Sequence, residues 1–312
     1  MIFPVFDLHC DTALKLLGKR CHGDGFLRNN QFHIDIEHAK KYPGYCQCFA
    51  CFTSPLEQLP KKMSVEDMFE RQISVLLREI NSNADLISQA YNAAEIQRNR
   101  ENGRMSALLT IEGPAGFGYD PALLENLRQI GFCITTLGWN ESNILTGSHI
   151  TGEGLTELGR EYVKEAQRVG MLVDVSHISD RGFWDIIEIS NAPVIASHSN
   201  SRAICNHSRN LTDDMFLAIC QTGGIVGINF CAGFLGENTT IDTICDHIYH
   251  FLSLDPTGKH IALGSDFDGV NILPDGITGV ESYDFLAERL QVRGLDDQTI
   301  MNIFWNNAIG VL

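Results

Sequence analysis

The sequence lacks an excess of positive charge. Its 312 residues contain 39 Asp and Glu against 23 Lys and Arg, which gives a formal charge of −16. Proteins hold nucleic acid through its phosphates and need a basic surface for this, so the acidic balance argues against a nucleic-acid partner. An acidic field instead suits a soluble enzyme or a protein that attracts cations.

Long apolar stretches and targeting signals are also missing. No run approaches the roughly 20 apolar residues that cross a bilayer. The beginning, MIFPVFDLHCD, has no basic segment followed by a long apolar one, so a secretory signal is not expected in this sequence. We predict a cytoplasmic protein with reduced thiols and no membrane span.

Phosphate-binding glycine motifs are absent as well. No G-x-G-x-x-G follows the first predicted strand and no Walker A sequence occurs, so dinucleotide and P-loop functions lose their main support. The chain has only 9 Pro and shows no repeat, low-complexity tract or Pro/Ser-rich linker. We therefore expect a single catalytic domain over residues 1–312.

Ten cysteines are present, and their neighbours indicate packing. Cys46, Cys48 and Cys51 lie in an apolar run with strand alternation, where thiols behave as small buried side chains. A metal site at these cysteines is the alternative, but no second C-x-x-C follows at zinc-finger spacing.

Short apolar runs recur along the chain and predict eight strands. The runs are nearly continuous rather than alternating, which is typical of strands buried on both faces of a parallel sheet. They cover residues 3–8, 45–52, 106–111, 132–137, 171–176, 193–197, 225–230 and 260–264.

Helical periodicity fills the segments between these runs, most clearly at residues 64–80, where Ser64 is a candidate N-cap and Asp67 stands at N3. Further helices are predicted at residues 155–169, 180–190, 212–221 and 241–254. Strands that alternate with helices in this number predict an α/β fold, a closed (β/α)₈ TIM barrel of the metal-dependent hydrolase type. A doubly wound sheet is the alternative, because periodicity cannot count the neighbours of a strand.

Polar residues that can bind metal follow the predicted strands at their carboxyl ends. His9 and Asp11 end the first strand, Glu112 the third, His177 the fifth and His198 the sixth. This mixture of nitrogen and oxygen ligands suits zinc. Five protein ligands exceed one tetrahedral site, whereas two ions that share a carboxylate and a water use them all.

Several further motifs stand in one order along the chain: D-L-H-C-D at 7–11, H-I-D-I at 33–36, Q-C-F-A at 47–50, I-E-G at 111–113, L-V-D-V-S-H-I-S at 172–179, P-V-I-A-S-H-S at 193–199, S-R-N-L-T-D-D at 208–214 and G-S-D-F-D-G at 264–269. From about residue 6 to the C-terminus the chain thereby resembles the membrane dipeptidase (renal dipeptidase) family of zinc dipeptidases, peptidase family M19. These enzymes have an amidohydrolase-like barrel. Ordered motifs are far more specific than any single match.

The resemblance implies a role for each matching residue. His9 and Asp11 would bind one zinc ion, His177 and His198 the second, and Glu112 would bridge the pair.

Two more residues receive a role from the same resemblance. Arg209 would hold the terminal carboxylate of a substrate, a task that suits a planar bidentate donor; the alternative is a surface ion pair with Asp213 or Asp214. Asp266 would exchange protons with the attacking water and the leaving amine. Asp268 is then a structural residue or a partner that orients a ligand.

The resemblance implies that the protein hydrolyses dipeptides with a free C-terminal carboxylate. The attacking group would be a hydroxide that bridges two Zn²⁺ ions. The resemblance also implies a homodimer. One departure concerns the substrate: the family's histidine near the reacting carbonyl is replaced by Trp139, so either Asn140 supplies a polar contact or the second zinc acts alone. This keeps open the hydrolysis of another small amide, such as an N-acyl amino acid or a lactam. A metal-binding protein with a decayed site is the third alternative.

Overall fold

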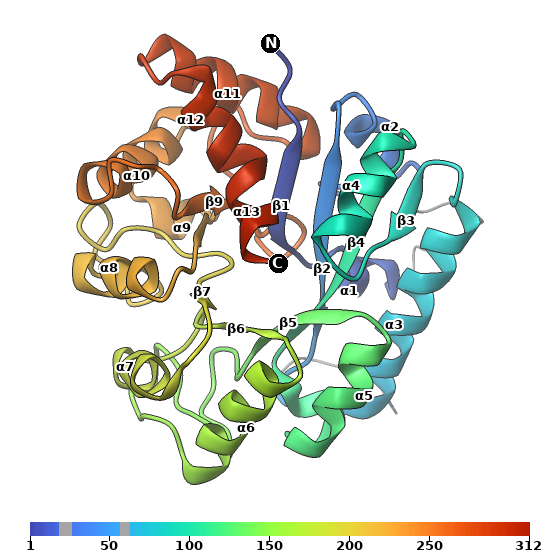
Figure 1. Ribbon diagram of the computed structural model, residues 1–312, viewed down its shortest axis with the longest axis vertical. Helices are drawn as coiled ribbons and strands as arrows, with labels where there is room; N and C mark the ends of the chain where they lie inside the picture. Colours follow the sequence, from blue (N-terminus) through green and yellow to red (C-terminus); the bar gives the residue numbers. More distant parts are fainter. Residues whose placement is uncertain (19–26, 57–62) are drawn as a thin grey trace.

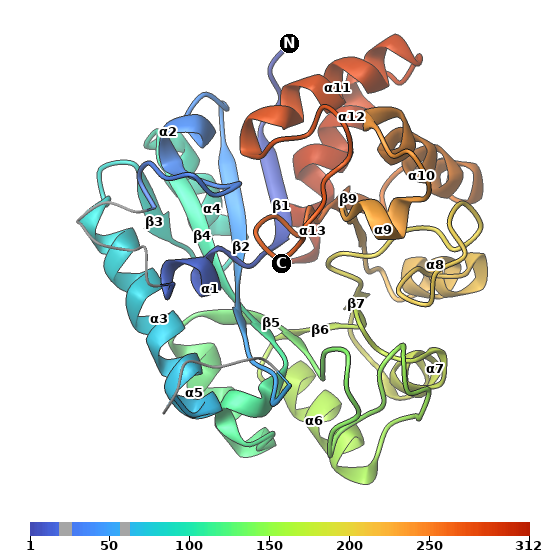
Figure 2. The same cartoon turned by 180° about the vertical axis from the view of Figure 1, so that it is seen from behind.

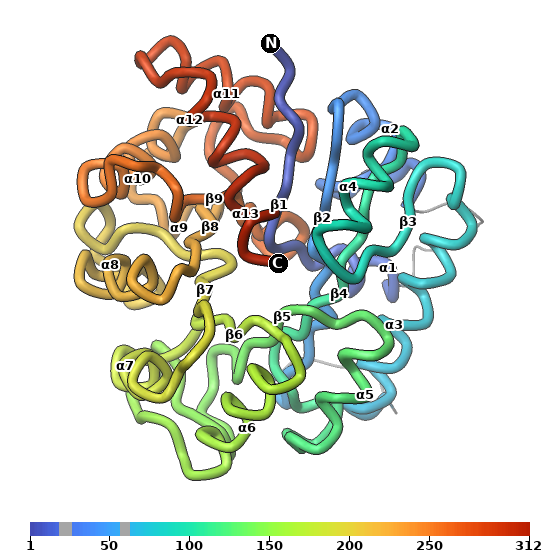
Figure 3. The backbone as a smooth tube through the Cα atoms, in the orientation of Figure 1, coloured from blue at the N-terminus to red at the C-terminus, as the bar shows by residue number. Residues whose placement is uncertain are grey.

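Parallel strands form a barrel in the computed structural model, which describes residues 1–18, 27–56 and 63–312. The barrel strands are β1 (Val5–Cys10), β2 (Tyr45–Phe52), β4 (Met105–Glu112), β5 (Phe132–Thr136), β6 (Leu172–Asp174), β7 (Val194–Ile195), β8 (Val226–Ile228) and β9 (Ile261–Leu263). The chain runs once round the ring, which brings its first and last strands, β1 and β9, side by side as a parallel pair (Figure 3).

The ring closes between β7 and β8 at a narrow seam. A single parallel bridge joins Ala196 to Val226, with hydrogen bonds from Ala196 N to Ile225 O (3.0 Å) and from Gly227 N to Ala196 O (2.8 Å). This closure confirms the predicted (β/α)₈ barrel, and the alternative of an open doubly wound sheet is wrong.

Side chains continue the seam beyond the bridge. The Oδ1 atom of Asn200 accepts from Asn229 N (3.0 Å), and the Nδ2 atom of Asn200 donates to Asn229 O (2.9 Å). The amide of Asn200 thus pairs with the main chain of Asn229 as a neighbouring strand would, and it satisfies two buried backbone groups.

The helices ring the strands (Figures 1 and 2). They are α1 (Thr12–Leu16), α2 (Ile36–Ala39), α3 (Val65–Ser82), α4 (Ala93–Glu101), α5 (Leu124–Gln129), α6 (Glu157–Arg168), α7 (Asp180–Ile189), α8 (Asp213–Gln221), α9 (Ala232–Leu235), α10 (Ile241–Leu254), α11 (Tyr283–Val292), α12 (Asp297–Met301) and α13 (Asn307–Val311). The predicted cap of α3 is present, because Ser64 and Asp67 form a reciprocal capping box. Within the described ranges, no helix combines the length and apolar character that a membrane crossing requires.

One mouth of the barrel is filled by apolar side chains. Phe6, Cys46 and Cys48 belong to the inner cluster, and the edge of Trp305 meets the ring of Phe6 at 6.0 Å. Trp305 comes from the π-helical turn at Asn302–Asn306, which continues into α13 over this mouth (Figure 1). The interior of the barrel is therefore apolar at this mouth, and the five predicted ligands lie at the opposite one.

The nine cysteines within the described ranges are all free, and Cys46, Cys48 and Cys51 are fully buried in β2. None of the candidate metal clusters found among the described residues includes these three. The prediction that they pack rather than bind metal agrees with this placement.

The sheet differs from prediction in several places, and β8 and β9 are shorter than the predicted strands at 225–230 and 260–264. The strand β3 (Ile87–Gln89) was missed; it has only 3 residues and pairs with β4 outside the ring. The predicted strands at 171–176 and 193–197 are longer than β6 and β7, because Asp174 diverts the backbone. Its Oδ1 atom accepts from Ser176 N and from Ser197 N, both at 2.9 Å, so these amides leave the ladder.

Candidate metal centre

The five predicted ligands meet at the carboxyl ends of the barrel strands. They are His9, Asp11, Glu112, His177 and His198, and all five are buried. A cavity of about 700 Å³ opens onto Asp11, Glu112 and His177. The barrel thus gathers residues that lie up to 189 positions apart in the chain, as parallel strands with a common direction require.

Glu112 lies between two groups of side chains. Its Oε2 atom is 3.4 Å from His9 Nε2, which is also 3.5 Å from Asp11 Oδ2. Its other oxygen, Oε1, lies 2.9 Å from His177 Nε2 and 3.8 Å from His198 Nε2. The two carboxylate oxygens therefore face the two predicted ligand sets, which is the placement that a bridging carboxylate needs.

Hydrogen bonds leave the Nε2 lone pairs of both His177 and His198 unprotonated. Ser197 Oγ donates to the carboxylate of Asp174, so it must accept from His198 Nδ1, which lies 2.7 Å away. His177 Nδ1 is 2.9 Å from Asn140 Oδ1 and donates to it. Because each ring carries its proton on Nδ1, both Nε2 atoms are free to bind a metal.

These atoms fit a cation. The Nε2 atoms of His177 and His198 are 3.0 Å apart, and two lone pairs at that distance repel each other unless a positive charge lies between them. On the other side of Glu112, the buried atoms His9 Nε2 and Asp11 Oδ1 have no hydrogen-bond partner within the described part of the chain. Buried polar atoms are costly without a partner, and nitrogen and carboxylate donors together suit zinc.

The electrostatics of the cluster reflect its burial. Burial first, and then the nearby charge of Asp11, raise the pKa of Glu112 to about 7. Burial lowers the pKa of His177 and of His198 well below the ordinary histidine value. Burial also opposes the charged form of His9, but Glu112 and Asp11 outweigh it and raise the His9 pKa. His177 and His198 are thus neutral, as metal ligands must be, whereas His9 would have to give up its proton when a metal binds.

Asp266 stands at the edge of this cluster, beyond β9. Its backbone has φ 61°, a left-handed conformation that L residues seldom adopt. Oδ2 accepts from Asn229 Nδ2 (2.9 Å), while Oδ1 lies 3.9 Å from His9 Nε2. Burial is the main cause that raises the pKa of Asp266 to about 6. His9, Asp11 and Asp266 also form a candidate metal cluster, so Asp266 is near enough to act as a ligand or as a proton carrier.

Asp268 has other partners. It accepts from Thr12 Oγ1 at 2.6 Å and from His33 N at 2.8 Å, and therefore ties the end of β1 to the segment that leads into α2. This agrees with the prediction that Asp268 is structural.

Arg209 is buried, with 4% of its surface exposed. Its guanidinium donates to Ser199 Oγ and to His198 O, both at 3.3 Å, and its Nε has no hydrogen-bond partner in residues 1–18, 27–56 and 63–312. The alternative of a surface ion pair is wrong: Asp213 pairs with His250 at 2.7 Å, and no salt bridge joins Arg209 to a carboxylate of the described residues. A buried cation without a paired carboxylate is suited to an anionic ligand.

Comparison with known proteins decides the family. A model of the membrane dipeptidase family (peptidase family M19) matches residues 2–312. The chain belongs to this family. Its members are metallo-dipeptidases, and the match extends over both ligand sets, Asp266 and Arg209.

Curated relatives support the same assignment. An "uncharacterized protein in pqqA 5′ region" of Klebsiella pneumoniae is 34% identical over 263 residues, which are 79% of this chain and 95% of the relative. An uncharacterized dipeptidase of Schizosaccharomyces pombe is 31% identical over 248 residues, 77% of this chain. The match spans 61% of the length of that yeast protein.

Solved structures share the whole fold. A metallopeptidase of Rhodobacter sphaeroides, crystallised with a phosphinate mimic of the dipeptide L-Ala-D-Ala, has a TM-score of 0.87 at 26% identity, with 100% of this chain and 99% of that chain covered. The metallopeptidase named dipeptidase AC has a TM-score of 0.87 at 28% identity, with 100% and 98% covered.

Trp139 occupies the place where the membrane dipeptidase resemblance led us to expect a histidine. It lines the cavity, meets Phe52 edge to face at 5.1 Å and lies 6.2 Å from the ring of His177. Asn140 cannot replace that histidine through its oxygen, because Oδ1 already accepts from His177 and from His149 Nε2 (3.0 Å). Only the amide hydrogens of Asn140 remain for a substrate.

Sequence reasoning missed the side chains that hold the ligands in place. His149 connects Asn140 to Ser208 Oγ (2.8 Å), next to Arg209, and Asn229 holds Asp266. Asn229 could have been noticed, because it is the one polar residue inside the apolar run at 225–230. His149 lies in an irregular loop, where the sequence has no helical or strand periodicity from which its hydrogen-bond partners could be predicted.

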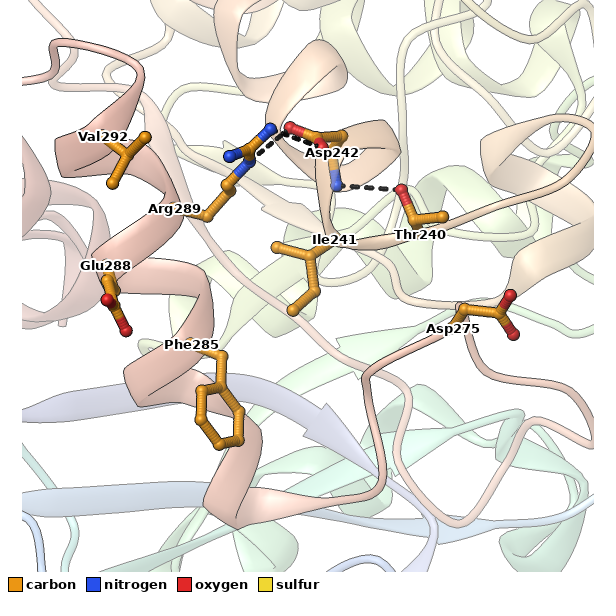
Figure 4. A pocket seen from close by; sticks show the side chains of 8 residues that line it. All are labelled: Thr240, Ile241, Asp242, Asp275, Phe285, Glu288, Arg289 and Val292. Carbon is orange, nitrogen blue, oxygen red and sulfur yellow. Dashed lines mark hydrogen bonds and ion pairs between the residues drawn. The ribbon is translucent and has the colours of Figure 1, made fainter.

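A second hollow lies outside the barrel, between α10 and α11 (Figure 4). It has a volume of about 340 Å³. Arg289 donates to Asp242 there at 2.6 and 2.7 Å, so the two charges neutralise each other. None of the candidate metal clusters of the described residues includes a residue of this hollow.

Proposed function

We propose that the protein hydrolyses dipeptides with a free C-terminal carboxylate, using two zinc ions held by the five predicted ligands. The observation that carries the proposal is the position of Glu112, whose two oxygens face His9 on one side and the pair of His177 and His198 on the other. Zinc ions bound there would lower the pKa of a shared water to about 7 and polarise the scissile carbonyl.

Side chains of the protein provide proton transfer and substrate binding. Asp266 takes a proton from the attacking water at Oδ1 and passes it to the departing amine, since Oδ2 is held by Asn229. Its pKa of about 6 suits both steps near neutral pH. Arg209 binds the terminal carboxylate of the substrate, and Phe234, on whose ring its guanidinium packs at 5.5 Å, lines the cavity beside it.

The size of the cavity supports a small substrate. Its volume of about 700 Å³ is within the ~300–1,000 Å³ usual for small-molecule sites. The structurally similar Rhodobacter sphaeroides enzyme was crystallised with a mimic of L-Ala-D-Ala. We therefore propose alanyl dipeptides with L- or D-alanine at the second position as the first probes.

Arg209 provides the decisive experiment. If it holds the carboxylate, the free acid of a dipeptide should exceed the C-terminal amide in kcat/KM by about tenfold to a hundredfold, because charged hydrogen bonds contribute about 1.5–3 kcal/mol. Arg209→Met should remove this preference by slowing the acid, with the metal content unchanged. Equal rates for acid and amide on the unmutated enzyme would contradict the proposal.

A second candidate function is the hydrolysis of another small amide at the same metal centre. Trp139 favours it, because an apolar wall replaces a polar contact next to His177. An N-acyl amino acid or a lactam hydrolysed faster than every dipeptide of a panel would establish this candidate. A decayed site receives no support, since none of the five candidate ligands nor Asp266 has been replaced by a residue unable to bind metal or carry a proton.

A further inference from the structure

A second cluster of metal-ligating side chains lies at the other end of the barrel from the metal centre. Cys220 is in the last turn of α8, Asp255 caps the C-terminus of α10, and His260 directly precedes β9. The thiol sulfur, one carboxylate oxygen and one ring nitrogen lie within 4.8 Å of one another. The opposite end of β9 leads to Asp266, so the two clusters occupy different mouths.

The backbone orients His260. Its Nδ1 atom lies 2.7 Å from the carbonyl oxygen of Gly224. A carbonyl oxygen only accepts, so Nδ1 carries the proton and Nε2 keeps its lone pair. Histidines that bind metal in proteins are commonly held in this way, with the second nitrogen donating to a carbonyl or a carboxylate.

Asp255 has one oxygen in use and one without a partner. Oδ1 accepts from Thr257 N (3.1 Å) and from Thr257 Oγ1 (2.6 Å). Oδ2 is buried and has no hydrogen-bond partner among the residues that the structure describes. A buried carboxylate oxygen without a partner destabilises the folded state, and a bound cation would supply what it lacks.

Cys220 is not suited to nucleophilic chemistry. Burial first, and then the charge of Asp255, raise its pKa to about 12, so the thiol is protonated in the metal-free protein. A reactive cysteine needs the reverse environment. A cation reverses the balance, because a coordinating thiol loses its proton to solvent.

We propose that Cys220, Asp255 and His260 bind one further zinc ion, which fastens the ends of α8 and α10 to the start of β9. Sulfur, nitrogen and oxygen donors with a water as fourth ligand make a tetrahedral zinc site. The helices already meet where Phe216 and Phe251 stack at 4.3 Å, so the ion holds elements that are in contact. At this mouth of a barrel, such a site acts on stability rather than on turnover.

Cobalt distinguishes this site from the catalytic centre. The predicted ligands of the catalytic centre are nitrogen and oxygen atoms alone, whereas Cys220 would give a thiolate-to-cobalt charge-transfer band. The metal-free full-length protein is titrated with Co²⁺ in a reductant that does not chelate. The band should appear in the unmutated protein and in Cys205→Ser, another partly buried free thiol, and be absent in Cys220→Ser. A band that persists in Cys220→Ser, or none in the unmutated protein, would overturn the proposal.

Zinc content and melting temperature give a second readout. After loading with Zn²⁺, Cys220→Ser should hold one ion fewer per chain than Cys205→Ser. Its melting temperature should be about 5 °C lower, because it loses the stabilisation that a zinc ion supplies when it is present at a hundredfold excess over its Kd. Dipeptide turnover should stay the same. If Cys220→Ser does not fold, Asp255→Asn replaces it, and unchanged cobalt spectra in that variant would equally refute the site.

Discussion

Asn140 decides which nitrogen of His177 faces the metal centre. Its Oδ1 atom accepts from His177 Nδ1 at 2.9 Å and so keeps Nε2 unprotonated. Partners of this kind are commonly worth 10–100-fold in metal affinity. We expect Asn140→Leu to weaken zinc binding by about that factor, as measured by competition with a zinc-binding dye.

Asn140→Asp is the matched control, because its carboxylate still accepts from both His177 and His149. The affinity of this variant for zinc should stay close to that of the unmutated protein. Equal losses in Asn140→Leu and Asn140→Asp would mean that the shape of the loop, and not the hydrogen bond, positions His177.

Asp266 allows a similar test of its role. Asp266→Asn keeps the shape and the contact with Asn229 but removes proton transfer, so turnover should fall by about 10²–10⁴ with both catalytic metals retained. Metal analysis and kcat are measured on the same preparation. If activity falls only in proportion to lost metal, Asp266 is a ligand, as its place beside His9 and Asp11 would then explain.

The sequence predicted which side chains gather at the candidate metal centre but not which residues hold them in place. His9 and Glu112 lie at the ends of β1 and β4 and His198 follows β7, and parallel strands bring such positions to one mouth of a barrel. The partner of a ligand follows from loop geometry instead. Ser197 was visible beside His198, but its bond to Asp174 depends on the early end of β6.

Among the helices, α10 carries a histidine that makes folding sensitive to acid. His247 is fully buried; Nδ1 accepts from Ser201 N (3.0 Å), and Nε2 donates to Leu235 O (3.1 Å). Burial lowers the pKa of His247 in the folded state. In the unfolded chain this histidine has an ordinary pKa of about 6.5. Below that pH the unfolded chain therefore binds a proton that the folded protein does not bind.

The free energy of unfolding should therefore decrease as the pH falls below about 6.5, by at most about 1.4 kcal/mol per pH unit from this one group. Urea denaturation at several pH values between 7.5 and 5 measures the slope. His247→Gln cannot take up this proton, so its slope should be shallower by up to that amount. An identical slope in both proteins would assign the acid sensitivity to other groups.

The ends of a strand could be predicted from the sequence only where a run of apolar residues begins and ends with the strand. The pattern places β2 correctly at its full length of 8 residues, because β1 and β4 cover both its edges and every side chain is buried. It misses β3, whose last two residues are only partly buried. It overextends β7, since Ser197 uses its backbone amide to bond Asp174.

The assembly of whole molecules and their location stay predictions. The family resemblance led us to expect a homodimer, so light scattering should give about twice the chain mass of 34.7 kDa. A mass of one chain over the whole concentration range would refute the dimer. The cytoplasmic location can be examined by fractionation of cells that produce the full-length protein.

The narrow seam between β7 and β8 affects how mutation can alter this barrel during evolution. Elsewhere in the ring, main-chain hydrogen bonds join the strands, and no substitution other than proline removes them. Above Ala196 the ring is held by one main-chain bond, from Ser199 N to Gly227 O (2.8 Å), and by the side chain of Asn200 on the main chain of Asn229. A substitution of Asn200 can therefore loosen the contact between β7, which leads to His198, and Asn229, which holds Asp266. The distance between His198 and Asp266 then changes although both residues stay the same.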